Sequence, residues 1–217
     1  MHDWFDSRVA ALGPVEFPTF GSTRIMMMPV ILGDLGSLPD DLARWRPLFG
    51  RLCDLAPFNQ GTAYLTIDER VVPAGATHRR PGIHVDGIGE DGSAGAYGGG
   101  GGYGKSGMLL AASHLGCRAW EQRFDGAPGP DGDCASLAAQ CRADAERPLT
   151  ASVAFWCGPL TVHEALPMAS ETARQFARLS GPSDAPWHEG YTANPLGIPP
   201  TGRIAPRRPE HFMRGMS

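Results

Sequence analysis

Glycine and proline recur along the whole chain, and this limits its fold more than any other feature. The 217 residues include 29 glycines and 20 prolines, well above the average usage of both residues. Both favour turns and interrupt long helices, so short strands are expected rather than a helix bundle. Sandwiches and barrels of this length are commonly single domains. We therefore expect residues 1–217 to form a single, mainly β domain with a few flanking helices.

Short runs rich in β-branched and apolar residues, bounded by turn residues, indicate where the strands lie. The expected strands are residues 24–32, 62–72, 108–112, 117–124, 150–156, 160–166 and 173–180. We expect the strand at 117–124 to pair antiparallel with the strand at 108–112. Cys157-Gly158-Pro159 separates two of the expected strands and predicts a β-hairpin there.

Two segments show helical patterns. Apolar residues recur at helical spacing between Leu42 and Leu55, and Ser37 is the expected N-cap of this helix. We expect the helix to pack on the outside of a sheet. A second, short helix is expected at residues 134–145, capped by Asp133.

The net charge and the cysteines limit the cellular setting and the partners. A net charge of −4 and a pI near 5.9 give no general electrostatic footprint for nucleic acid. The five cysteines form no C-x-x-C pair, which indicates free, mostly buried thiols in a reducing compartment. The N-terminus lacks the regions of a signal peptide, and the longest apolar run, residues 25–32, is too short to span a membrane. We expect a cytoplasmic protein that binds neither nucleic acid nor a membrane.

A histidine and an aspartate, His84 and Asp86, stand two residues apart in a short β-like run between a Pro-Gly pair and a glycine. Alternate residues of a strand share a face, so the two side chains would lie on the same side, about 6–7 Å apart along the chain. That is close enough for both to bind one metal ion. A third ligand must then come from elsewhere in the chain.

His163 is the strongest candidate for the third ligand, because it lies inside a second β-like run, residues 160–166. Two histidines and one carboxylate on one face, with open coordination positions, form the arrangement expected of non-haem Fe(II) oxygenases. His114 follows a strand and is the next candidate. His188 and His211 lie in loop-like segments and are expected to be structural or on the surface.

His84-x-Asp86, a distant His163 and an arginine on the next strand resemble the pattern of the 2-oxoglutarate-dependent Fe(II) dioxygenases. The fold of that family is a double-stranded β-helix, also called a jelly roll and shared in outline with the cupins. In the family, an arginine soon after the second histidine binds the distal carboxylate of 2-oxoglutarate, often with a serine two residues later. Arg178-x-Ser180 fits this pattern.

Arg174 is the second choice for this anchor, because residues 174, 178 and 180 share a strand face. Arginine suits the role because its planar fork pairs bidentately with a carboxylate. The resemblance covers about residues 62–181, which we expect to be the core. Residues 182–217 lack periodicity and are expected to wrap that core as an ordered arm.

The resemblance implies that His84, Asp86 and His163 hold Fe(II), and that 2-oxoglutarate and dioxygen are co-substrates. Hydroxylation of a small metabolite or amino-acid derivative is the default outcome, while desaturation, cyclisation and epoxidation would use the same residues. A carboxylate at position 86 argues against a halogenase, whose metal needs that position free for halide. The substrate and the oligomeric state stay open.

Charged and aromatic residues near the ligands indicate how a substrate is held. Arg79 and Arg80, beside His78, are expected to line the pocket mouth and hold an anionic substrate. The glycine-rich loop at residues 87–107 is long, as functional loops often are, and is expected to act as a lid. The residues expected to close over the substrate are Tyr97, Tyr103 and Lys105.

Three other interpretations stay open. Residues 99–106 match the phosphate-binding pattern G-x-x-x-x-G-K-[ST], although no buried apolar strand precedes them and consecutive glycines make a chance match easy. A cupin-like metalloenzyme would keep the metal ligands without 2-oxoglutarate, and Arg178 would then only form a structural ion pair. In a non-catalytic β-sandwich binding module, the histidines would be core residues.

Overall fold

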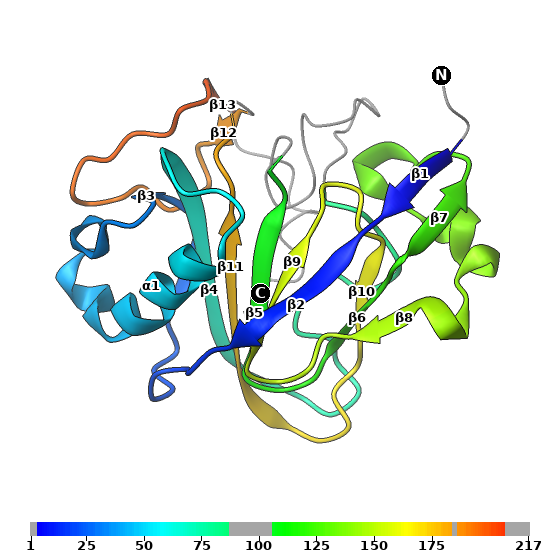
Figure 1. Cartoon of the computed structure of the whole chain (residues 1–217). Helices are drawn as coiled ribbons and strands as arrows, with labels where there is room; N and C mark the ends of the chain where they lie inside the picture. The colour runs from blue at the N-terminus through cyan, green and yellow to red at the C-terminus, as the bar shows by residue number, and fades with distance from the viewer. Residues whose placement is uncertain (1–3, 87–105, 184–185, 207–217) are drawn as a thin grey trace.

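The computed structural model describes residues 4–86, 106–183 and 186–206. It confirms a mainly β protein with few helices (Figure 1). Its sheets are antiparallel except for the short β12-β13 pair, which is parallel. The strands are β1 (Trp4–Ser7), β2 (Val9–Pro14), β3 (Arg24–Ile31), β4 (Thr62–Val72), β5 (Met108–Ala112), β6 (Cys117–Trp120), β7 (Gln122–Asp125), β8 (Glu146–Pro148), β9 (Val153–Cys157), β10 (His163–Ala165), β11 (Thr172–Ser180), β12 (Trp187–His188) and β13 (Ile204–Ala205). The helices are α1 (Arg46–Leu55) and the 3-10 helices η1 (Leu35–Ser37), η2 (Asp40–Trp45), η3 (Pro130–Gly132), η4 (Ala135–Gln140) and η5 (Ala143–Ala145).

Six strands form the main sheet, in the order β2-β9-β5-β11-β4-β3. At its centre, β11 pairs with β4 on one side and with β5 on the other. Side chains alternate along a strand, so Ala177 and Leu179 point to one face of this sheet. Arg174, Arg178 and Ser180 share the opposite face.

Helices η2 and α1 cover the first face of the main sheet (Figure 1). Trp45, Phe49 and Leu52 are fully buried against an apolar row that includes Leu65 and Ile67 of β4. The apolar spacing between Leu42 and Leu55 therefore identifies a helical segment that packs on a sheet, as predicted.

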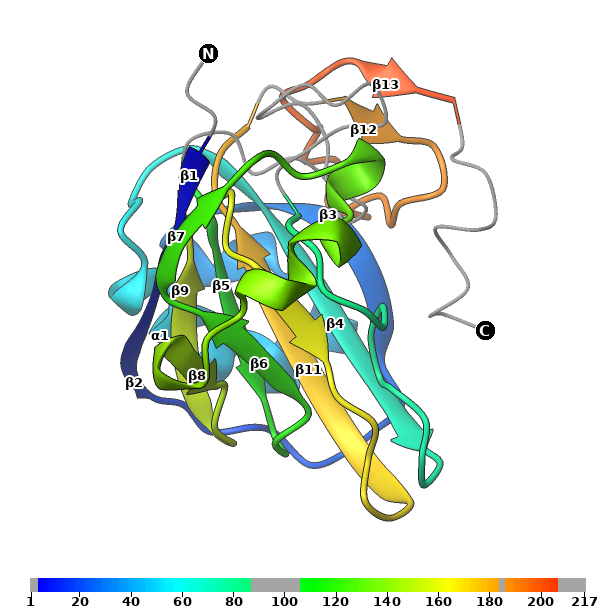
Figure 2. The ribbon, with the colours of Figure 1, turned by 90° about the vertical axis from the view of Figure 1, so that its right-hand side faces the viewer.

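The second face is covered by a smaller sheet, in the order β10-β6-β8, while β1 and β7 form a separate antiparallel pair (Figure 2). The buried residues between the two layers include Met108, Leu110, Phe155 and Phe176 from the main sheet and Cys117, Ala119 and Ala165 from the smaller one. The charged side chains of β11 therefore point toward the space between two sheets.

Two predicted strand pairings are wrong. β6 pairs with β10 and β8, whereas β5 pairs with β11 and β9. β9 and β10 form no hairpin, because Gly158 and Pro159 carry the chain from the main sheet into the smaller one. Local sequence identifies extended segments, but their partners depend on packing between distant parts of the chain.

The helix boundaries also differ from the predictions. Helix α1 begins only at Arg46, because Pro47 has no N–H with which to continue the hydrogen bonds of the preceding turn. Ser37 is not an N-cap; its hydroxyl donates to the Asp34 carbonyl. Residues 134–145 form two short 3-10 helices, although Asp133 does accept from the Ala135 N–H. In the described ranges no helix is long and apolar enough to cross a membrane.

The main and the smaller sheet are not joined into one closed sheet by strand pairing among the described residues. The double-stranded β-helix expected from the resemblance therefore stays a prediction. The free-thiol prediction is confirmed: all five cysteines are free, and Cys117, Cys134 and Cys157 are buried. Burial raises the pKa of Cys134 to about 12.

Residues 186–206 form an ordered arm against β3. Asn194, which is buried, donates from Nδ2 to the Pro29 carbonyl (2.8 Å) and to the Ser37 carbonyl (2.9 Å). One side chain thus ties the arm both to β3 and to the end of η1.

We predict that Asn194→Ala lowers the free energy of unfolding by about 2 kcal/mol, because it leaves buried carbonyl groups without their donor. The measurement is urea unfolding followed by circular dichroism. Asn59→Ala is the matched control, because Asn59 is exposed and its loss should change the free energy by less than about 0.5 kcal/mol. Equal effects of the two substitutions would contradict this role of Asn194.

Candidate metal centre

His84 and His163 are fixed to each other by their backbones. The His84 N–H donates to the His163 carbonyl and the His163 N–H to the His84 carbonyl, both at 2.9 Å. The predicted β run at His84 is reduced to isolated bridges, in which His84 pairs with His163 at the edge of β10 on one side and with Asp133 on the other. Because the two residues are directly paired, their side chains leave the backbone on the same side.

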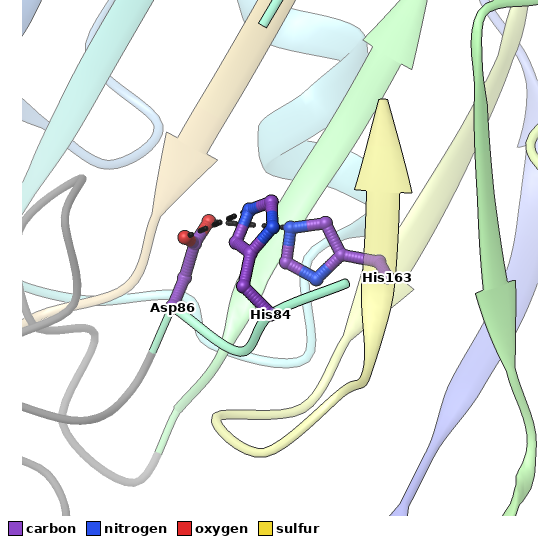
Figure 3. Close-up of side chains that lie close together, drawn as sticks. All are labelled: His84, Asp86 and His163. Atoms are coloured by element: carbon purple, nitrogen blue, oxygen red, sulfur yellow. Dashed lines mark ion pairs between the residues drawn. The ribbon is translucent and has the colours of Figure 1, made fainter. Parts of the chain in front are cut away.

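The side chains of His84, Asp86 and His163 converge (Figure 3). Nε2 of His84 lies 3.7 Å from Asp86 Oδ1, and Nε2 of His163 lies 3.5 Å from Asp86 Oδ2. One potential ligand atom from each residue lies within 4.8 Å of the other two. All three side chains are buried, although they are polar. The three residues that the sequence selected therefore form one cluster.

Both imidazole rings are oriented by backbone carbonyls. Nδ1 of His84 contacts the Gly82 carbonyl (2.7 Å), and Nδ1 of His163 contacts the Thr161 carbonyl (2.8 Å). A carbonyl only accepts, so each Nδ1 carries a proton, and Nε2, the ring atom that faces Asp86, is the one left to bind a metal. Such hydrogen bonds are typical of metal-binding histidines, where they fix the tautomer and the ring orientation.

The ionisation of the cluster also suits a cation. Burial, reinforced by the nearby His163, lowers the pKa of His84 to about 3. Burial alone would raise the pKa of Asp86, but the hydrogen bond from His163 and the neighbouring positive charges hold it well below its ordinary value. His163 has a raised pKa, because its hydrogen bond to Asp86 outweighs burial. The site thus holds a buried carboxylate that needs positive charge beside it.

The donor set fits a divalent transition metal. Two neutral imidazole nitrogens and one carboxylate oxygen form the facial triad of non-haem Fe(II) sites. His84, Asp86 and His163 would hold the ion on one side and leave its other positions open. The set does not by itself select iron, because Mn²⁺, Co²⁺ and Zn²⁺ accept the same ligands.

Arg178 approaches the cluster from β11 of the main sheet, where Ser180 shares its face. Nη1 of Arg178 lies 3.6 Å from Asp86 Oδ2, and the side chains of both residues are buried. Nη2 of Arg178 lies 3.1 Å from Sδ of Met27, and the Ser180 hydroxyl lies 3.9 Å from the same sulfur. Arg178 therefore lies beside the candidate metal ligands, and Ser180 lies near the same methionine sulfur as Arg178.

Arg174 points from the same strand face into a different network. Its guanidinium donates to the His114 carbonyl (3.1 Å) and contacts His78 Nδ1 (2.9 Å) and Cys117 Sγ (3.6 Å). Arg174 is fully buried, and these contacts explain it as part of the core. Geometry therefore favours Arg178 over Arg174 as the residue that faces the metal ligands.

Asp68 of β4 is the centre of that second network. It forms ion pairs with Arg24, Arg70 and Arg79 and lies 3.5 Å from His78 Nε2. Burial lowers the pKa of His78 to about 4, so His78 is neutral near pH 7. His78 is therefore a core residue and not part of an exposed pocket mouth.

The two expected substrate residues have separate roles in the fold. Arg79 donates to Asp68 (2.9 Å), and its guanidinium lies over the Phe176 ring, 5.0 Å from the centroid. Arg80 donates to the Asp131 carbonyl (2.9 Å). Burial, reinforced by the nearby charge of Arg178, lowers the pKa of Arg79. The charge of Arg80 helps to lower the pKa of His84.

The remaining candidates lie elsewhere. His114 is exposed and contacts the Ser113 hydroxyl, and His188 contacts the Pro206 carbonyl. The expected substrate and surface residues outside the described residues are Tyr97, Tyr103, Lys105 and His211. The phosphate-loop match is also mostly outside them, but the chain continues from it into strand β5 and not into the helix that such a loop requires.

Sequence reasoning missed Met27 and Asp68. Asp68 alternates with Thr66 and Tyr64 along β4, and this polar alternation inside a buried strand was a usable signal. Met27 gave no signal, because an apolar residue in an apolar run is ordinarily a core residue.

We predict that His84→Ala, Asp86→Ala and His163→Ala each abolish stoichiometric binding of Fe(II) or Mn(II), because each removes one of three ligands. Metal content after anaerobic loading and desalting is the measurement. His114→Ala is the matched control, since it removes an exposed histidine, and it should retain the metal. Wild-type metal content in the triad variants would contradict the site.

Comparison of this chain with models of protein families, with curated proteins and with solved structures found no match.

Proposed function

We propose that this protein is an Fe(II)- and 2-oxoglutarate-dependent oxygenase that acts on a small molecule. The observation that carries the proposal is the approach of Arg178 to the triad, with Nη1 3.6 Å from Asp86 Oδ2. A buried metal triad alone fits many enzymes. An arginine that faces it from another layer, with a serine on the same strand face, adds a receptor for a carboxylate, as a dicarboxylate co-substrate requires.

Each residue has a defined part in this proposal. His84, Asp86 and His163 hold one side of the metal, and bound Fe(II) would supply the activation of dioxygen that accompanies conversion of 2-oxoglutarate to succinate and CO2. Arg178 and Ser180 bind the far carboxylate and so fix the orientation of the co-substrate. Burial of all five residues excludes bulk water and strengthens these charge interactions.

Charge balance supports a dianionic co-substrate. Without metal, the carboxylate of Asp86 is a negative charge close to Arg178. A divalent ion bound to Asp86 would neutralise that carboxylate and leave one net positive charge beside the positive charge of Arg178. A dicarboxylate that contacts both the metal and the guanidinium would restore neutrality in this buried place.

The double-stranded β-helix is part of the same proposal. The triad comes from the edge of the smaller sheet, while the anchor comes from the main sheet. The site thus lies between two facing antiparallel layers, as in a jelly roll. The other proposed reactants are dioxygen and a small metabolite or amino-acid derivative. A cupin-like enzyme that uses the metal without 2-oxoglutarate is the alternative that the next experiment separates.

We predict that anaerobic addition of Fe(II) and 2-oxoglutarate gives a weak visible charge-transfer band. Arg178→Ala should raise the Kd for 2-oxoglutarate by about 30-fold or more, because loss of a buried charged partner costs about 2 to 5 kcal/mol. Arg142→Ala is the control, because its side chain is largely exposed, and its Kd should be unchanged.

Metal content is measured in the same samples, so that loss of iron is not mistaken for loss of the co-substrate. Iron-loaded wild-type protein that shows no band and no binding of 2-oxoglutarate would contradict the proposal and favour the cupin-like alternative.

A further inference from the structure

Strand β3 contains a bulge at Met26 and Met27. Ile25 pairs with Ile67 and Met28 pairs with Leu65, so three steps along β3 match two steps along β4. Met27 has φ +50°, a left-handed backbone conformation that is uncommon for residues other than glycine. Such a conformation costs free energy and persists only where the surroundings hold it.

Other parts of the chain satisfy the backbone groups at this bulge. The Met27 N–H donates to the Thr66 hydroxyl (3.0 Å), and the Trp187 indole N–H donates to the Met27 carbonyl (2.9 Å). The Met26 N–H donates to the Thr192 hydroxyl (2.9 Å). The bulge is therefore held from β4 on one side and from the C-terminal arm on the other.

The extra residue decides which face Met27 occupies. In a regular strand, residues 25 and 27 would share a face, and Ile25 packs with the core beneath helix α1. The bulge instead places Met28 on that face, since Met28 belongs to the same core, while Met27 packs with Met26, Tyr64 and Trp187. The inserted residue thus turns Met27 toward Arg178.

The Met27 sulfur contacts both proposed anchor groups. It lies 3.1 Å from Arg178 Nη2 and 3.9 Å from the Ser180 hydroxyl. The other terminal nitrogen of Arg178 lies 3.6 Å from Asp86. The guanidinium therefore lies between the metal ligands and the Met27 thioether. A thioether is a weak acceptor, whereas a carboxylate is the strong partner of an arginine fork.

We propose that Met27 sets the chain length of the 2-oxo acid that this site accepts, which rests on the proposed function. A 2-oxo acid held by the metal at one end and by Arg178 at the other must place its far carboxylate beside the Met27 sulfur. The thioether closes the space beyond the anchor. A longer acid would clash with the Met27 side chain. A shorter acid would not reach Arg178 while it contacts the metal.

The test compares three 2-oxo diacids that differ by one methylene each: oxaloacetate, 2-oxoglutarate and 2-oxoadipate. Their Kd values are measured by calorimetry on the full-length protein loaded with Mn(II), under conditions in which metal content is verified. Wild-type protein should prefer 2-oxoglutarate over 2-oxoadipate by about tenfold or more, because one misplaced methylene in a fitted site has roughly that effect.

Met27→Gly removes the side chain and suits the positive φ, so the bulge is retained. It should shift the ratio of the two Kd values toward 2-oxoadipate by about tenfold. Met27→Ala, an independent truncation, should shift the ratio in the same direction. Met27→Leu refills a similar volume without sulfur and should keep the wild-type ratio within about threefold.

An unchanged ratio in either truncated protein, with 2-oxoglutarate still bound, overturns the assignment of Met27 and leaves the proposed function intact. A shift in Met27→Leu equal to that in Met27→Gly also overturns it, because the effect would not follow side-chain volume. Metal-loaded wild-type protein that binds none of the three acids overturns the proposed function, and the assignment of Met27 falls with it.

Discussion

The candidate site depends on two backbone hydrogen bonds, those that His84 and His163 exchange. They join the segment that follows β4 to the free edge of β10, residues far apart in the chain. Because the bonds fix the two backbones, the imidazole rings have their direction before any ion binds. Further bonds from Nδ1 to carbonyls within two residues then fix the tautomers. Asp86 follows His84 on the same segment, so this segment and its pairing with β10 together set the geometry of the three candidate ligands.

The face of the main sheet opposite the helices separates two kinds of buried charge. Near Ser180 it presents Arg178 to Asp86 and the other candidate metal ligands. Further along the same face, Asp68 forms ion pairs with Arg70 and Arg79 and lies close to His78, and these residues make up a separate buried network. Arg178 therefore differs from the arginines of that network in the carboxylate that it contacts, which is Asp86 and not Asp68.

The cluster of candidate ligands and the facing arginine were readable from sequence because they follow strand periodicity and a spacing of chemically distinctive residues. His84-x-Asp86, His163 and Arg178-x-Ser180 need only an extended backbone to present their side chains together. What failed was nonlocal: β6 does not pair with β5, and Gly158-Pro159 crosses between layers and makes no hairpin. The bulge at Met27 was also unreadable, because it is held by Thr66 and Trp187 from distant segments. Local propensity contains no information about such contacts.

The most direct test of the central claim is an anomalous-diffraction map from crystals grown without oxygen in Fe(II) and 2-oxoglutarate. The account predicts one iron peak about 2.0–2.3 Å from His84 Nε2, His163 Nε2 and an Asp86 oxygen, a range typical of such ligands. It also predicts that the far carboxylate of 2-oxoglutarate contacts Arg178. Iron bound elsewhere, or a triad that stays closed by direct contact between Asp86 and the two imidazoles, would contradict it.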